Sequence, residues 1–587
     1  MDLRILDTSI GGQSRKIQDL RNRRSNCIAK RRAPESKRPY KRVRQVASAP
    51  GAPENGSDIR CMEYNMTSSP NSNQAHVWVG NAGSILRTPI PHQLDTDGRD
   101  VFGKAAHVLY HLSAKGFIET STSSLVVTEK FHHESEDSKR IMKLARDCMA
   151  HNVPVLAKGP RLEGSWLNGL DADRLNKYGI ELQREVQSLD FYDQERRNLE
   201  SGESPPHKQD QIYEHPETIY HRICERTNDS PEQSTPDPSD SDQEIVVYTN
   251  MLVLELMASV NEGASKYVLD LPTSKGSGIP YGRVHYHMLL GAYLTPVGCR
   301  ALNDFEQSMN NTSSMYPDEI AYPDLIWALA HGSQVITWWH HDCDGKMTVV
   351  NAESGAKIWT IFRPKPNMSA ADFVSLQLWL CERKDKLPKP EYGDIINILL
   401  LPGDTLFMPP GTIHMVYTPV PSIFRGSSFW LVGSLHLTRW SRRSDSDHAV
   451  TLTNVDHKQH FVFSSLVRIA LGIPVMAHTR KGLSQSSLLS LYDMLINGQA
   501  YIPTKSGSRN RKQTANKLAK QLTEETSFYE VAIRVLERLL LEAGFQVPSS
   551  LEQKKRTSAQ WVRKSADELW WKSVGEFSLE GIHREDF

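Results

Sequence analysis

The stretch that decides the predicted fold and chemistry is residues 337–342, Thr-Trp-Trp-His-His-Asp. Its β-branched and aromatic residues favour an extended strand. Side chains alternate between the two faces of a strand, so His340 and Asp342, two positions apart, point to the same side. The stretch therefore predicts an imidazole and a carboxylate presented together, as a metal site requires.

A second segment, residues 408–414 with the sequence Met-Pro-Pro-Gly-Thr-Ile-His, places His414 directly after a proline–glycine turn. Two imidazoles and one carboxylate on one side of a metal leave three coordination positions open. That suits ferrous iron, which must also take a co-substrate and oxygen. His340, Asp342 and His414 are therefore the predicted metal ligands and catalytic residues of an iron-dependent oxygenase.

The neighbouring histidine offers an alternative. In the other strand frame His341 pairs with Cys343, and histidine with cysteine is a combination typical of zinc. Only the His340 frame has a carboxylate two positions later together with Thr337 three positions earlier. His340 is the preferred ligand, and His341 is expected to point outward or to support the ligands from behind.

Many short strand candidates surround these two segments. They are separated by proline, glycine and aspartate, as strands in a sheet commonly are. They cover residues 336–339, 347–351, 357–362, 395–401, 405–408, 413–417 and 429–437. With no helices alternating between them, they predict an antiparallel sandwich or barrel. A jelly roll would bring residues from distant strands to one mouth.

The whole chain has 587 residues, 39% of them hydrophobic, and a formal net charge of zero. This composition permits a real core but predicts sizeable disordered parts. The seven cysteines are scattered and form no CxxC pair, which argues against a disulfide framework or a zinc finger and fits a reducing compartment. No apolar run is long enough to predict a transmembrane helix, and the N-terminus lacks the apolar region of a secretory signal.

Composition divides the chain into five parts. They are a disordered basic N-terminal region (1–100), a helical and strand part that opens the catalytic region (101–194), a disordered, acidic, Pro/Ser-rich insertion (195–243), a strand-rich catalytic part (244–445) and a C-terminal helical region (446–587). Helical apolar spacing is predicted at 101–115, 138–150, 244–262, 460–472 and 484–497, and a short buried strand at 152–159.

Residues 15–44 form a basic block in which only Asp19 and Glu35 oppose the lysines and arginines. Such tracts act as nuclear import signals or as weak nucleic-acid contacts. A solvated, self-repelling tail is the alternative. The block favours a nuclear location, with a cytoplasmic one as the alternative.

A lysine and a threonine complete the predicted site. An iron held in this way can chelate 2-oxoglutarate, whose distal carboxylate needs a cationic partner deep in the barrel. Lys357, in the segment Ser-Gly-Ala-Lys-Ile-Trp at 354–359, is the predicted partner, and the hydroxyl of Thr337 is the predicted second donor. A surface lysine and an ordinary strand threonine are the alternatives.

The three segments resemble the Jumonji C (JmjC) family in their residues and their order, over about residues 244–440. The resemblance implies a mainly β core with helices (α+β), built as a double-stranded β-helix of the jelly-roll or cupin type. It also implies Fe(II) and 2-oxoglutarate as cofactors. By this resemblance the iron ligands are His340, Asp342 and His414, and the 2-oxoglutarate-binding residues are Lys357 and Thr337.

JmjC proteins oxidise protein lysines, other protein side chains or, less often, RNA bases. The resemblance therefore implies a dioxygenase that hydroxylates or N-demethylates a protein side chain, with histones among the candidate substrates. The aspartate ligand is commoner among the family's hydroxylases, although one demethylase branch also uses it, and no cysteine-rich zinc module accompanies the site. Tyr293 and Asn351 are candidates for further 2-oxoglutarate contacts. The alternatives are an inactive jelly-roll scaffold that binds chromatin or another protein, and an oxygenase of small molecules or RNA bases.

Overall fold

The structure is a computed structural model. It describes residues 63–65, 75–128, 136–159, 170–177, 180–201, 249–272, 326–365, 368, 370–383, 386–447, 452–453, 459–474, 483–503, 511–526 and 528–562. All of these belong to one compact unit, Cys61–Phe587. The basic block at 15–44 lies outside the described residues.

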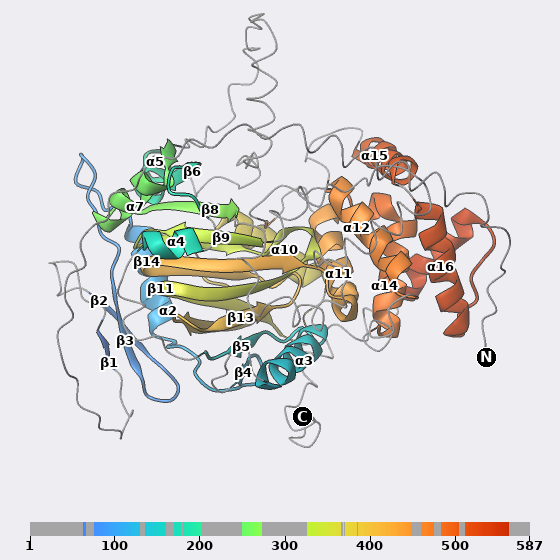
Figure 1. Ribbon diagram of the computed structural model, residues 1–587, viewed down its shortest axis with the longest axis horizontal. Helices are drawn as coiled ribbons and strands as arrows, with labels where there is room; N and C mark the ends of the chain where they lie inside the picture. The colour runs from blue at the N-terminus through green and yellow to red at the C-terminus, as the bar shows by residue number, and fades with distance from the viewer. Residues whose placement is uncertain are drawn as a thin grey trace, which may run out of the picture. The chain divides into compact units, whose positions relative to one another are not determined.

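Eleven of the described strands join one mixed sheet. Its order is β4 (Val126–Thr128), β5 (Val155–Ala157), β13 (Thr405–Met408), β11 (Met347–Pro364), β14 (His414–Phe429), β9 (Ile326–His331), β8 (Lys266–Pro272), β6 (Glu185–Asp190) and β7 (Thr249–Leu252), while β10 (Val335–His340) pairs with β14 and β12 (Gly393–Leu400) pairs with β11. Figure 1 shows the long antiparallel strands β11 and β14 side by side, with β13 and β9 as their outer neighbours. This is the predicted jelly-roll α+β fold, with a mainly β core and flanking helices.

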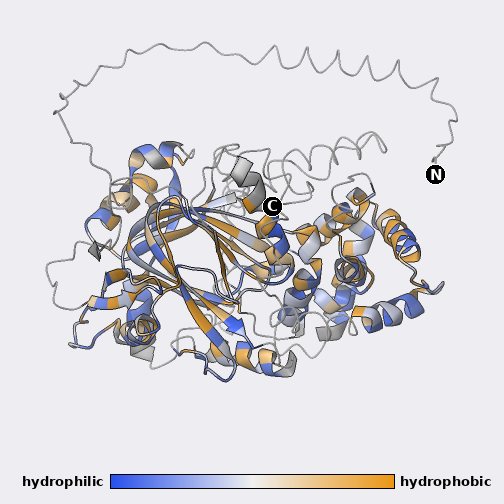
Figure 2. Cartoon of the chain, turned by 90° about the horizontal axis from the view of Figure 1, so that it is seen from below, coloured by the Kyte–Doolittle hydropathy of each residue, from blue (hydrophilic) through white to orange (hydrophobic). Residues whose placement is uncertain are grey.

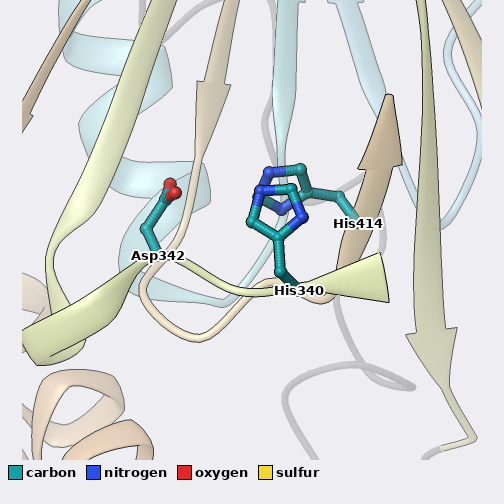
Figure 3. A group of neighbouring side chains, drawn as sticks. All are labelled: His340, Asp342 and His414. Atoms are coloured by element: carbon teal, nitrogen blue, oxygen red, sulfur yellow. The ribbon is translucent and has the colours of Figure 1, made fainter. Parts of the chain in front are cut away.

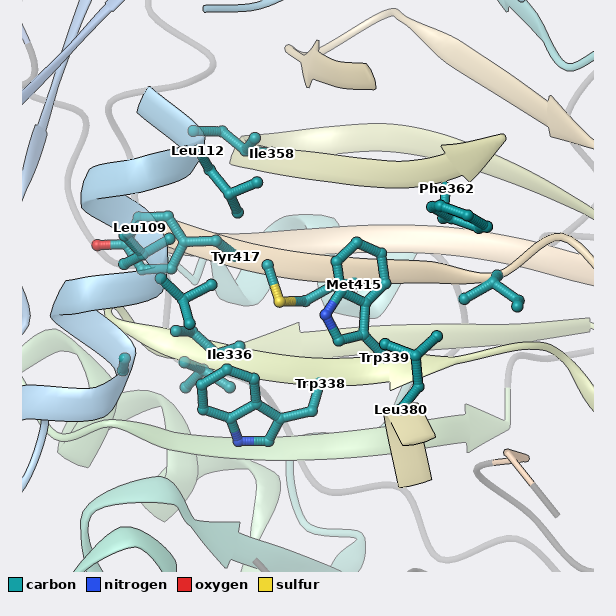
Figure 4. Packing of buried hydrophobic residues seen from close by; sticks show 14 of the residues in the cluster. Leu109, Leu112, Ile336, Trp338, Trp339, Ile358, Phe362, Leu380, Met415 and Tyr417 are labelled. Carbon is teal, nitrogen blue, oxygen red and sulfur yellow. The ribbon is translucent and has the colours of Figure 1, made fainter. Parts of the chain in front are cut away.

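Both faces of the central strands β11 and β14 are buried, although both strands also carry polar residues. One face, here called the interior face, holds a cluster that includes Trp359, Ile361, Ile398, Leu406 and Val416. The opposite face packs against helix α2 (Gly103–Ser113), and Figure 4 shows Ile336, Ile358 and Tyr417 beside Leu109 and Leu112 of that helix. Figure 2 shows hydrophobic and hydrophilic residues mixed along the strands.

Strand β11 changes its alternation midway. Val350 and Ala352 lie in the interior cluster, and so do Trp359 and Ile361. Strict alternation would place an even-numbered and an odd-numbered residue of one strand on opposite faces. The pairing of β11 with β14 shifts register between Ala352 and Ile358, around Gly355. Gly355 has φ +68°, and a Cβ there would lie 2.1 Å from the carbonyl oxygen of Pro421, so only glycine fits the bulge. The bulge therefore reverses the alternation, so that the odd-numbered residues of the second half of β11 face the interior.

The helices flank the sheet and continue beyond it. Besides α2, those named here are α3 (Glu136–Ala150), α4 (Ala172–Lys177), α5 (Phe191–Ser201), α7 (Val253–Asn261), α10 (Ala370–Glu382), α11 (Leu435–Asp447), α12 (Gln459–Gly472), α14 (Gln485–Ile496), α15 (Arg511–Glu525) and α16 (Tyr529–Glu542). Ser484 caps α14 by accepting a hydrogen bond from the backbone N–H of Ser487. The helices after β14 share a hydrophobic core of their own. Among the described helices, none is both long and apolar enough to cross a membrane.

The prediction of disorder over residues 1–100 is wrong where that region is described. β1 (Glu63–Asn65), β2 (Ala75–Val79) and β3 (Ile85–Pro89) form a separate three-stranded sheet. Trp78 and Leu86 are fully buried and join the cluster around α2. The alternating burial of β2 was hidden in the sequence because only a few apolar residues stand among glycine, asparagine and proline.

Several predicted strands have different limits. The candidates 347–351 and 357–362 are one strand, β11, and 413–417 extends to Phe429 as β14. The candidate 429–437 is wrong, because the chain leaves the sheet at Phe429 and enters α11 at Leu435. Helix α10 lies between β11 and β12, against the expectation that no helix interrupts the strands. Local apolar patterns do not reveal where a strand loses its pairing partner.

Two further predictions need correction. The predicted helix over 244–262 contains β7, which pairs with β6, before α7 begins at Val253. The predicted insertion at 195–243 begins too early, since α5 continues to Ser201. Glu195 in that helix is buried and accepts a hydrogen bond from the indole of Trp338, which ties α5 to the sheet. Residues 202–243 lie outside the described residues.

Candidate metal centre

Two histidines face each other at the end of the β10–β14 pair. His340 and His414 are register partners in this antiparallel ladder, just after a bulge that follows Thr337. Both are buried, and their ring centroids lie 4.1 Å apart. The pairing of two strands more than 70 residues apart in the chain thus brings the two imidazoles together.

Hydrogen bonds orient both imidazole rings. The Nδ1 atom of His340 lies 2.7 Å from the carbonyl oxygen of Trp338, and the Nδ1 atom of His414 lies 2.9 Å from that of Thr412. A carbonyl oxygen only accepts, so each Nδ1 carries the proton and donates it. Each Nε2 then carries the lone pair, which is the tautomer that a metal ligand needs.

Asp342 supplies the carboxylate. The strand β10 ends at His340, so Asp342 stands just beyond it, but its backbone remains extended and keeps the two side chains on the same side. The hydroxyl of Thr348 on β11 donates a hydrogen bond to the Asp342 carboxylate. One ligand atom from each of His340, Asp342 and His414 lies within 4.8 Å of the others. Figure 3 shows the three side chains projecting to the same side of the chain.

This donor set fits ferrous iron. Two neutral imidazoles and one carboxylate on one side match the facial arrangement that leaves three coordination positions open. Among the described residues, these three form the only such group of histidine, cysteine and carboxylate side chains.

His341 has a different role. Its Nε2 lies 3.0 Å from a carboxylate oxygen of Asp445 on α11, and its backbone N–H donates to Leu452. Burial alone would lower the pKa of His341, but the charge and hydrogen bond of Asp445 outweigh it and raise the pKa. The expectation that His341 points outward is therefore wrong, because it is buried against the C-terminal helices. Cys343 does not join it, since its thiol donates to Asp344 and burial raises its pKa.

Lys357 is fully buried on the interior face, the same face as Trp359 and Ile361. Its Nζ lies 2.8 Å from Nδ1 of His331 and 5.3 Å from the centre of the Phe424 ring. Burial lowers the pKa of Lys357 well below its usual value. Across the part of the chain that the structure describes, no carboxylate pairs with it. A buried ammonium without an anionic partner is costly, so this site is suited to an anionic ligand.

Thr337 lies on the same face. It pairs with Val416 on β14, and Val416 pairs in turn with Trp359 on β11. The predicted residues His414, Lys357 and Thr337 therefore share one face of the sheet. Asn351 does not, because it faces the other way and bonds Thr405 and Glu353. Tyr293 lies outside the described residues.

The sequence did not single out four residues that support this site. They are Thr348, which donates to Asp342; the backbone of Thr412, which orients His414; Trp359, which stacks on His414; and His331, which contacts Lys357. Trp359 lies both in the core and against the site. His331 carried no signal, because its strand β9 was not among the predicted strands.

A comparison with known proteins shows a partial similarity. The chain is 30% identical over 133 residues to the JmjC domain-containing histone demethylation protein 1 of Cryptococcus neoformans var. neoformans serotype D. The match covers 22% of this chain and spans 14% of the relative's length. No protein-family model matches the chain. The similarity supports the resemblance to JmjC proteins over part of the chain.

Proposed function

We propose that this chain is an Fe(II)- and 2-oxoglutarate-dependent dioxygenase of the JmjC type that hydroxylates or N-demethylates a protein side chain. The observation that carries the proposal is the convergence of His340, Asp342 and His414, with ligand atoms within 4.8 Å of one another, on a jelly-roll sheet. Iron with 2-oxoglutarate would supply the oxidation of a C–H bond.

The residues of this chain hold and orient the reactants. The carbonyl groups of Trp338 and Thr412 keep the two imidazoles in the ligating tautomer, and Thr348 keeps the carboxylate of Asp342 in place. Lys357 would neutralise the distal carboxylate of 2-oxoglutarate, and Thr337 would donate a second hydrogen bond to it. The apolar interior face around these groups keeps water away and strengthens their electrostatic interactions.

The metal site does not separate hydroxylation from N-demethylation, because both begin with attack on a C–H bond. We propose a protein substrate, with histone tails as the first candidates, since the relative from Cryptococcus neoformans is named a histone demethylation protein. A nuclear location, and a weak nucleic-acid contact through residues 15–44, belong to the same proposal.

The test is turnover of 2-oxoglutarate to succinate by the full-length protein with Fe(II) and oxygen. Wild-type protein is expected to form succinate, and His340→Ala and Asp342→Ala to form none. Mass spectrometry of histone peptides then distinguishes loss of a methyl group from gain of an oxygen atom. Absence of turnover together with absence of bound iron in the folded wild type would reject the proposal in favour of a non-catalytic scaffold.

A further inference from the structure

His331 and Lys357 meet inside the sheet. They come from β9 and β11, which are separated by β14, and their side chains reach each other along the interior face. His331 is 1% exposed and Lys357 is fully buried. Burial, and then the charge of Lys357, lower the pKa of His331 well below its usual value, so its imidazole is neutral at pH 7.

When Lys357 carries its proton, as it would beside a bound anion, the contact determines where the imidazole proton of His331 lies. A neutral imidazole that accepts the Lys357 ammonium proton at Nδ1 must carry its own proton at Nε2. This Nε2 atom is buried and has no hydrogen-bond partner among the described residues. Buried donors are nearly always satisfied, so the Nε2–H group of His331 is suited to donate to a ligand.

Two hydroxyl groups on β14 are also buried without a hydrogen-bond partner among the described residues. They are the Oγ1 atom of Thr418 and the Oγ atom of Ser422. Thr418 shares the parity of His414 and Val416, and Ser422 that of Phe424, so both stand on the interior face. Ser422 is the register partner of His331. An ammonium, an imidazole N–H and two hydroxyls thus gather on adjoining strands, and all of them can donate.

We infer that His331 is a second anchor for the distal carboxylate of the 2-oxo acid: its Nδ1 atom holds the ammonium of Lys357, and its Nε2–H donates to the carboxylate, assisted by the hydroxyl of Thr418. A carboxylate accepts about four hydrogen bonds, which matches this set of donors. The inference rests on the proposed function.

The spacing along β11 agrees with a diacid that joins this cluster to the metal. Ile361 is the register partner of His414 and lies four residues after Lys357 on the same face. Four strand residues span about 13 Å. Because the Lys357 side chain reaches across β14 to His331, the diacid would extend from the ammonium along the sheet, with the 2-oxo end at the metal.

The test is equilibrium binding of two 2-oxo acids to the full-length protein with Mn²⁺ under argon, measured by calorimetry. 2-Oxoglutarate is compared with 2-oxopentanoate, which has the same carbon chain but no distal carboxylate. Wild type is expected to prefer 2-oxoglutarate. His331→Leu should reduce that preference about ten- to hundredfold, the effect of losing a hydrogen bond to a charged group. His331→Gln, which keeps a donor near the Nε2 position, should retain most of it.

His436→Leu is the matched control, because it removes another largely buried histidine, which lies 3.3 Å from Ser487. It should leave the preference unchanged. Thr418→Val gives a second readout that does not depend on His331: removing an unpartnered buried hydroxyl should leave thermal stability equal or higher while weakening 2-oxoglutarate binding alone.

The outcomes separate the two proposals. If wild type binds neither acid in the presence of Mn²⁺, the proposed function fails. If wild type discriminates, and folded His331→Leu and Thr418→Val discriminate equally well, the anchor role of these residues is wrong. If His331→Leu does not fold, His331→Gln and Thr418→Val decide the question.

Discussion

The indole ring of Trp359 lies nearly parallel to the imidazole ring of His414, with ring centroids 5.0 Å apart and 23° between the planes. The indole therefore packs against one face of the His414 imidazole, a predicted metal ligand, and restrains its orientation. We expect Trp359→Leu to weaken Fe(II) or Mn²⁺ binding about tenfold, the effect of losing a residue that positions a metal ligand. The free energy of unfolding should fall by on the order of 2 kcal/mol. Metal titration and chemical denaturation measure the two effects.

Trp339→Leu is the control for that variant. Trp339 is also fully buried, but it packs in the cluster on the opposite face and donates to the backbone of Lys386. Its loss should cost similar stability without changing metal affinity. Equal loss of metal in both variants would show that the Trp359–His414 contact has no specific role.

The hydroxyl of Thr348 keeps Asp342 in place. Thr348→Val preserves the side-chain shape and removes the donor, so metal affinity is expected to fall about tenfold with little change in stability. The control is Thr405→Val, which breaks the 2.7 Å bond from Thr405 to Asn351 on the opposite face. That variant should lose about 1 kcal/mol of stability and keep its metal affinity. An unchanged metal affinity in Thr348→Val would remove Thr348 from the site.

The adjacent histidines should respond differently to substitution. His340→Gln is expected to abolish metal binding while leaving the fold intact. His341→Leu removes the imidazole that lies 3.0 Å from the buried carboxylate of Asp445, so it should destabilise the protein by roughly 1–3 kcal/mol yet retain the metal. Metal content and denaturation midpoints of the purified variants provide the measurement. The reverse pattern would make His341 the ligand.

Acid should destabilise the protein partly through His436. Burial, and then the nearby His151, lower the pKa of His436 to about 4, although the carbonyl of Ala150 acts in the opposite direction. The unfolded chain takes up this proton from about pH 6.5, whereas the folded chain resists it until about pH 4. The stability that this histidine contributes is therefore present above pH 6.5 and lost as the pH falls through this window.

His436→Gln should remove that part of the pH dependence. Between about pH 7.5 and pH 5, the wild type is expected to lose about 2 kcal/mol more than the variant. Denaturant titrations of both proteins at the two pH values test this. Parallel losses in the two proteins would mean that another group causes the acid sensitivity.

The sequence alone was enough to predict the jelly-roll class and the three residues that meet at the candidate centre. Both predictions depend on short-range rules. Alternation along extended backbone puts His340 and Asp342 on one side, and the proline–glycine turn marks His414 as the start of a returning strand. The strand at Thr405–Met408 and the helices near residues 103–113 and 485–496 were predicted closely for the same reason. In each of them the whole apolar pattern lies between two neighbouring turn signals in the sequence.

The tertiary structure alone decided which neighbours complete the site. Strict alternation from Val350 would have turned Lys357 away from the interior, and the bulge at Gly355 reverses that. His331 becomes the partner of Lys357 only because β14 lies between their strands. His341 contacts Asp445, about 100 residues later in the chain, instead of the metal ligands. Register shifts and pairings between distant strands depend on packing over the whole sheet, and no local window of residues carries that information.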